Sequence, residues 1–190
     1  MHSKRLIVTA LLTMAAAPAW AHAGGGHTSD FAAGFIHPLH GPDHVLAMVT
    51  VGLLAALLGG RALWAVPTSF VAMMLTGGGL GLAGIPVPAV EFGILASIVV
   101  LGAIVAWGRS LPVGLAMTLA GLFAVFHGHA HGSEMPLQAS AATYALGFAL
   151  ASAALHGLGI AAGMAALGFP RMVRLAGAAT ALAGVALAVS

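Results

Sequence analysis

Long apolar stretches alternate with short polar segments along most of the chain. We expect these stretches to form membrane-crossing helices, because about 20 predominantly apolar residues span roughly 30 Å of hydrocarbon. They lack the sustained two-residue alternation of a transmembrane β-strand. The pattern therefore predicts an all-α protein, a polytopic membrane helical bundle with six transmembrane helices. These helices are expected at 31–58, 62–83, 90–107, 112–129, 138–162 and 171–189.

The first residues have the pattern of a secretory signal peptide. Lys4 and Arg5 precede a short apolar run over 6–17, and residues 19–21 have the small-x-small pattern of a cleavage site. We therefore expect residues 1–21 to be removed. An uncleaved first span is the alternative.

Cleavage would leave residues 22–190 as a single transmembrane domain that begins at His22. The new terminal amine, His22 and the nearby His27 can capture a metal ion loosely outside the membrane. A glycine-rich tail without a role is the alternative reading of this segment.

The composition supports a membrane protein and narrows its chemistry. Only 5% of the 190 residues are charged and 61% are hydrophobic, whereas a soluble domain has about 25% charged residues. There is no clustered basic face of the kind that reads nucleic acid. We therefore expect the lipid bilayer and a small ligand as partners and no nucleic acid, and a homo-oligomer is left open. Cysteine is absent, which excludes disulfides, thiolate metal sites and cysteine nucleophiles.

The distribution of charge predicts an orientation. All basic residues beyond the signal fall in the first, third and fifth connections, namely Arg61, Arg109, Arg171 and Arg174. The positive-inside rule places these connections in the cytoplasm, so the mature N-terminus and the C-terminus are expected outside the bacterial inner (plasma) membrane. The four acidic residues then lie toward the external face, where an arriving cation meets them first.

Small residues recur through the apolar stretches. Gly77, Gly78 and Gly79 leave part of the second stretch almost without side chains. Such positions let helices approach closely in membranes, so we expect close helix–helix packing. Flexibility at a gate is the second interpretation.

Three histidines and an aspartate interrupt the first apolar stretch. A charged side chain at mid-membrane costs about 2.5–3.5 kcal/mol on insertion scales, so such residues usually mark a site or a pathway. On a continuous helix His37, His40, Asp43 and His44 fall within a sector of about 120°. Pro42 removes a helical hydrogen bond and opens the backbone there. The pattern predicts one wall of a metal site, and a kinked helix with packing histidines is the alternative.

A second cluster lies at the end of the fourth apolar stretch. His127, His131 and Glu134 are spaced i, i+4 and i+7, within about 60° of one helix face, and His129 points elsewhere. Imidazole together with carboxylate suits nickel, cobalt, zinc or copper. Because both clusters lie at the outer ends of their helices, they can form one site. A polar histidine-rich loop at the membrane surface is the alternative.

Further residues are weaker candidates, each with an ordinary structural alternative. Glu91 can close the site or be a surface glutamate that is stabilised at a helix N-terminus. Met48 can offer a thioether one turn beyond His44, or it can simply pack. His156 lies deeper and can relay an ion or fill a helix interface, and Phe70 is expected in the pathway lining or the core.

Both clusters resemble the motifs of the HupE/UreJ family of nickel or cobalt permeases. The first motif, HPxxGxDH, is matched in full by His37, Pro38, Gly41, Asp43 and His44. The second motif, FHGxAHGxE, is matched by Phe126, His127, Gly128, Ala130, His131, Gly132 and Glu134. The resemblance implies nickel transport that feeds hydrogenase or urease maturation. It also implies that metal recognition rests on His37, Asp43, His44, His131, Glu134 and Glu91.

We therefore expect a multi-pass permease that moves a divalent ion inward and is not an enzyme. It would hold no permanent cofactor, with nickel as the transported substrate and cobalt or zinc as alternatives. A metal-binding accessory protein without transport activity is one rival. A haem-dependent or metal-dependent membrane enzyme is another, although no HExxH motif is present.

Overall fold

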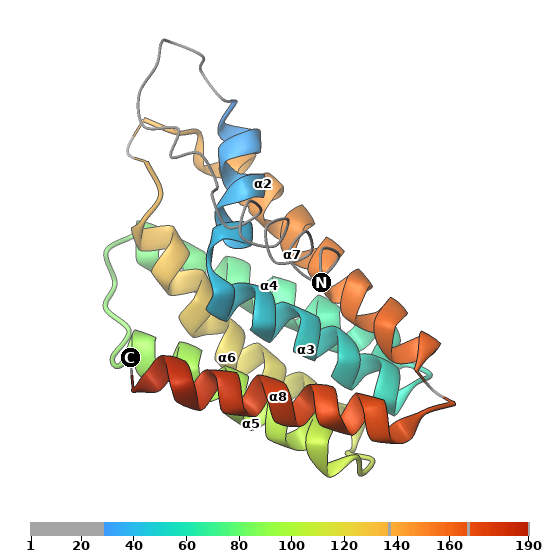
Figure 1. Cartoon of the computed structure of the whole chain (residues 1–190). Coiled ribbons are helices and arrows are strands. Elements are labelled where there is room, and N and C mark those ends of the chain that lie inside the picture. The colour runs from blue at the N-terminus through green and yellow to red at the C-terminus, as the bar shows by residue number, and fades with distance from the viewer. Residues whose placement is uncertain (1–28, 137, 167, 190) are drawn as a thin grey trace, which may run out of the picture.

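The computed structural model describes residues 29–136, 138–166 and 168–189. The expected signal peptide over 1–21 and the candidate ligand His22 lie outside these residues. Within them the secondary structure consists of α-helices without any strand, as expected (Figure 1). The helices are α2 (Asp30–His40), α3 (Pro42–Leu58), α4 (Ala62–Leu82), α5 (Val90–Trp107), α6 (Val113–Ser133), α7 (Ala141–Ala165) and α8 (Pro170–Ala188).

Five of these helices, α4 to α8, are long and apolar enough to cross a membrane. They confirm the expected stretches from 62 onward, with ends that differ by a few residues. The sixth candidate span is α2 together with α3, which are bent by 85° at a short break. The described part of the chain therefore has five candidate spans, or six if the bent pair is one span.

The span expected over 31–58 is broken into two helices, at the position where Pro42 was expected to open the backbone. Gly41 adopts an extended backbone, with φ −87° and ψ 109°, between the end of α2 and the start of α3. Pro42 causes this break, because its ring disfavours the helical conformation at the preceding residue. It then begins α3 at a position where its missing N–H is not needed. The four polar residues of the first stretch are therefore divided between two helices.

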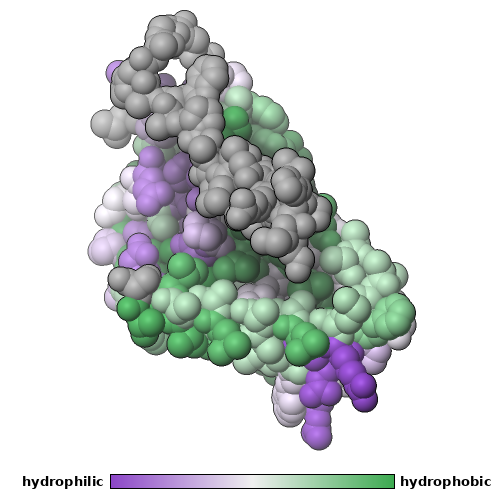
Figure 2. All heavy atoms as spheres, in the orientation of Figure 1, coloured by the Kyte–Doolittle hydropathy of each residue, from purple (hydrophilic) through white to green (hydrophobic). Residues whose placement is uncertain are grey.

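Helix α3 lies at the centre of the bundle (Figure 1). It packs against α4, α5, α7 and α8, and most of its residues are buried. The outward faces of the other helices carry large exposed apolar side chains such as Trp64 and Leu182. Figure 2 shows hydrophilic residues gathered in two regions that are separated by an apolar surface. This surface has the character expected for contact with lipid.

Glycines bring the helix backbones together, which confirms the packing interpretation. A Cβ atom at Gly128 of α6 would overlap the carbonyl oxygen of Met74 in α4, and one at Gly132 would overlap that of Gly78. Helices α2 and α7 meet in the same way, since a Cβ at Gly34 would overlap the carbonyl of Tyr144. These close approaches hold α4 and α7 beside the helices that carry the histidines.

Candidate metal site

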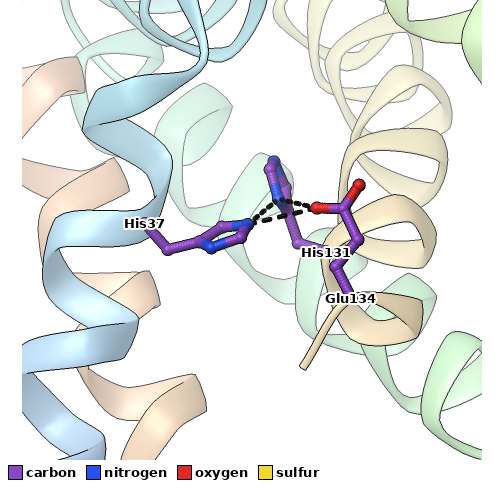
Figure 3. A group of neighbouring side chains, drawn as sticks. All are labelled: His37, His131 and Glu134. Carbon is purple, nitrogen blue, oxygen red and sulfur yellow. Dashed lines mark hydrogen bonds and ion pairs between the residues drawn. The ribbon is translucent and has the colours of Figure 1, made fainter. Parts of the chain in front are cut away.

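Three side chains from two helices converge at one end of the bundle. We call His37 of α2, His131 of α6 and Glu134, which directly follows α6, the trio (Figure 3). The Nε2 atom of His37 lies 2.9 Å from Nδ1 of His131 and 3.2 Å from Oε2 of Glu134. The third separation, from His131 Nδ1 to Glu134 Oε2, is 3.5 Å. Two imidazoles and a carboxylate therefore direct one atom each toward a common point.

These separations match those of atoms bound to one metal ion. Bonds of about 2.0–2.2 Å at angles of roughly 90–110° place neighbouring ligand atoms about 3.0–3.5 Å apart. The trio therefore offers three ligands of a borderline divalent ion with little rearrangement. Glu134 is 59% exposed and His131 only 15%, so the trio is open on the carboxylate side, where water can complete the coordination.

The local sequence explains how α6 presents two of the ligands. His131 lies in the last turn of α6, and Glu134 follows the last helical residue, one turn later on the same face. His37 reaches them because α2 ends before Gly41 and leaves the direction of α3. The break in the first stretch is therefore what allows α2 to contribute a ligand.

A deeper pair of histidines, His44 and His127, continues from the trio. Both are buried, with exposures of 0% and 1%. The ring centroid of His44 lies 5.0 Å from that of His131 and 5.3 Å from that of His127. Four imidazoles thus form a connected row from the exposed trio into the bundle.

A serine hydroxyl fixes the ring of His127. The hydroxyl of Ser97 donates to the carbonyl oxygen of Ile94 at 2.6 Å, and its oxygen lies 2.9 Å from Nε2 of His127. Because the only hydroxyl proton is already donated, His127 must donate its Nε2–H to the serine. The other nitrogen, Nδ1, then carries the lone pair that a metal ion can accept.

His44 is held in a similar way. Its Nε2 lies 3.1 Å from the hydroxyl of Ser152, which also approaches the sulfur of Met74 at 3.6 Å. The buried Nδ1 of His44 has no hydrogen-bond partner among the described residues. A buried unpaired acceptor is costly, so this nitrogen is available to a ligand.

Asp43 does not contact the trio directly. It is half-buried in the first turn of α3, where its Oδ1 accepts the backbone N–H of His44 at 2.7 Å. Its Oδ2 makes no hydrogen bond to any described residue. Asp43 thus stabilises the start of α3 and keeps one oxygen free next to the deeper pair.

The structure does not bring the remaining candidates into the trio. His40 ends α2 with an exposed side chain, because the break at Gly41 removes it from the expected common sector. Glu91 is exposed in the first turn of α5, where it makes no hydrogen bond or ion pair to a described residue. Met48 and Phe70 are fully buried core residues. Buried His156 contacts the Phe70 ring at a centroid distance of 5.3 Å.

Sequence reasoning missed three polar residues around the site: Ser97, Ser152 and Tyr144. The ring of Tyr144 lies 6.0 Å from that of His37, and its buried hydroxyl has no partner among the described residues. Each of these hydroxyl groups lies in an apolar helix. The sequence could have indicated them on that ground, because hydroxyl groups in membrane helices usually bond to a neighbouring helix. Their partners depend on the helix packing.

A cavity of about 270 Å³ lies beside the trio, between α4, α6 and α7. Its wall includes His131 and Tyr144 among mostly apolar side chains, and Gly78 and Gly132 leave room for it where α4 meets α6. His131 therefore has open space on this side.

Comparisons with known proteins agree with the two sequence motifs. The model of the family described as HupE / UreJ protein matches residues 10–187. The curated Protein HupE of Rhizobium leguminosarum bv. viciae is 45% identical over 187 residues, covering 96% of this chain and 97% of that protein. No solved structure matches the chain.

Proposed function

The chain belongs to the HupE/UreJ family, and from this premise and the trio's geometry we propose that it transports a divalent transition-metal ion inward. The substrate that the family favours is nickel, with cobalt as the nearest alternative. The membrane is the bacterial inner membrane, and the ion supplies the maturation of a metalloenzyme such as a hydrogenase or urease.

One observation carries the proposal: three ligand atoms from two helices lie at the separations of metal ligands, at the open end of an apolar bundle. Neutral imidazoles and a carboxylate suit late first-row divalent ions. The exposed Glu134 meets the hydrated ion first, and the imidazoles of His37 and His131 replace part of its water. His44 and His127 then provide the next nitrogen atoms toward the interior.

The membrane potential supplies enough energy for such a path. An inside-negative potential favours entry of a doubly charged ion by about 4.6 kcal/mol per 100 mV, twice the value for a single charge. The sequence contains no Walker-type glycine loop. A uniporter driven by the potential is therefore physically sufficient.

The test is uptake of radioactive nickel into liposomes that contain only the full chain, under an inside-negative potential. We expect uptake by the native protein and a loss of about tenfold or more for His131→Gln, because one ligand is removed. The matched control is His129→Gln in the same helix, since His129 bonds only the carbonyl of Ile85 and glutamine can keep that bond.

Uptake no greater than that of empty vesicles would refute transport. If the protein still bound nickel under those conditions, a metal-binding accessory role would replace the permease. Equal uptake by the His131→Gln and His129→Gln proteins would refute the assignment of the trio.

A further inference from the structure

The side chain of His156 is buried and does not belong to the metal site described above. It lies in α7 with an exposure of 1%, and neither ring nitrogen has a hydrogen-bond partner among the described residues. Buried polar groups in proteins are nearly always hydrogen-bonded, so one with two unpaired nitrogens calls for an explanation. An imidazole that packs for structural reasons would normally bond at least one neighbour.

His156 continues the row of imidazoles across an aromatic ring. The ring of Phe70 is fully buried and lies 5.9 Å from that of His127 and 5.3 Å from that of His156. Within the described residues the rings of His127 and His156 make no direct contact with each other. Phe70 therefore lies in contact with the rings of both His127 and His156.

A hydroxyl group of α4, that of Thr68, lies in the same groove as His156. A groove of about 400 Å³ between α4 and α7 is lined by His156, Pro67 and Thr68. The side chain of Thr68 is exposed, and its hydroxyl makes no hydrogen bond to a described residue. The buried imidazole of His156 and the hydroxyl of Thr68 therefore border a space large enough for an ion with some of its water.

The groove lies toward the end of the bundle that carries Arg61. Thr68 is within the first two turns of α4, which begins directly after Arg61. The trio lies at the C-terminal end of α6, which runs parallel to α4 and packs there against its later turns. An ion that leaves the deeper pair toward the Arg61 end thus reaches Phe70 and then His156.

We propose that His156 is a second metal-binding station, beyond Phe70, for the same class of late first-row divalent ion. The inference rests on the proposed function for the direction of travel, but not for the binding itself. His156 supplies one nitrogen, and the Thr68 hydroxyl and water supply oxygen. A site with one imidazole binds the ion more weakly than the trio does. Weak binding lets the ion leave this site again. The ring of Phe70 contacts His127 on one side of this step and His156 on the other.

The test counts nickel ions bound to the purified full chain by equilibrium dialysis, in the native protein and in His156→Phe. Phenylalanine retains a ring against Phe70 and removes both nitrogens. We expect the variant to lose one weakly bound ion per chain and to keep the affinity of the tight site that His131→Gln weakens. This retained tight site also reports that the variant is folded. Nickel uptake into liposomes should fall about tenfold.

A second variant, Thr68→Val, keeps the side-chain shape and removes only the hydroxyl. It should weaken the same second ion several-fold and leave the tight site unchanged. An unchanged number of bound ions in His156→Phe would overturn the proposal, whether or not uptake fell, because a packing role alone can slow transport. If the native chain bound the second ion but showed no uptake, the transport proposal would fail and the second station would stand.

Discussion

His44 and His127 each meet a serine hydroxyl through Nε2, at 3.1 and 2.9 Å. Such a bond sets which nitrogen carries the proton and fixes the orientation of the ring, and metal-binding histidines commonly use a partner of this kind. Ser97 is the clearer case, because its own proton is committed to the Ile94 carbonyl. In this protein the serines can therefore act on the ion through the histidines that they hold.

We predict that Ser97→Ala weakens nickel uptake into liposomes about tenfold, because the ring of His127 loses the acceptor that fixes it. The matched control is Thr118→Ala in α6, whose exposed hydroxyl bonds only the Gly114 carbonyl of its own helix. Uptake by Ser97→Ala equal to that of the control would show that the serine has no positioning role.

At the scale of the elements, the contact between α4 and α6 determines where two ligands of the trio lie. Gly128 and Gly132 of α6 face the backbone of α4 so closely that an added Cβ would overlap the carbonyl oxygens of Met74 and Gly78. The overlapping atoms belong to the backbone and cannot move aside as a flexible side chain can. A larger residue therefore separates the helices and displaces His131 with α6.

We predict that Gly128→Ala destabilises the protein by about 1–3 kcal/mol, the usual cost of overpacking, and reduces nickel binding. Gly114→Ala in the same helix is the control, because a Cβ there meets no atom within 4 Å. In a helix that change is neutral or stabilises by about 0.5–1 kcal/mol. Thermal unfolding in detergent measures both effects, and equal midpoints for the two variants would contradict the packing account.

The helices of this protein were predictable from the sequence only in part. The five helices from Ala62 onward follow from apolar length, which is a local property. The break at Gly41 depends on how Pro42 is accommodated, and a single helical wheel over 31–58 could not represent an 85° bend. Of the residues that this wheel grouped, the structure places His37 and His44 in the row of imidazoles and leaves His40 exposed at the end of α2.

Within the site, the sequence could predict neighbours along one helix but not contacts between helices. The spacing of His131 and Glu134 predicted that their side chains lie close together, and they do, because Glu134 directly follows the last residue of α6. The bonds of Ser97 and Ser152 to histidines join residues that are 30 and 108 positions apart. Only the packing of α5 on α6 and of α3 on α7 brings these pairs together.

At the scale of the whole molecule, the polar residues form an ordered path in an otherwise apolar bundle. The trio is exposed at one end, His44 and His127 are buried behind it, and His156 lies beyond Phe70. Arg109, Arg171 and Arg174 belong to the other end, where Arg174 bonds the carbonyl of Ala106 near the end of α5. An arrangement with carboxylate and imidazole at the entrance and arginines at the far end suits a cation that enters at the trio.

X-ray absorption spectroscopy of the nickel-loaded full chain tests whether His37, His131 and Glu134 bind one ion together. We predict nickel in a nitrogen and oxygen environment with scattering from at least two imidazoles, as the trio provides. His131→Gln should lose one imidazole from the spectrum, whereas His129→Gln should leave it unchanged. A nickel spectrum without imidazole scattering, or one that His131→Gln does not alter, would show that the trio does not bind the ion.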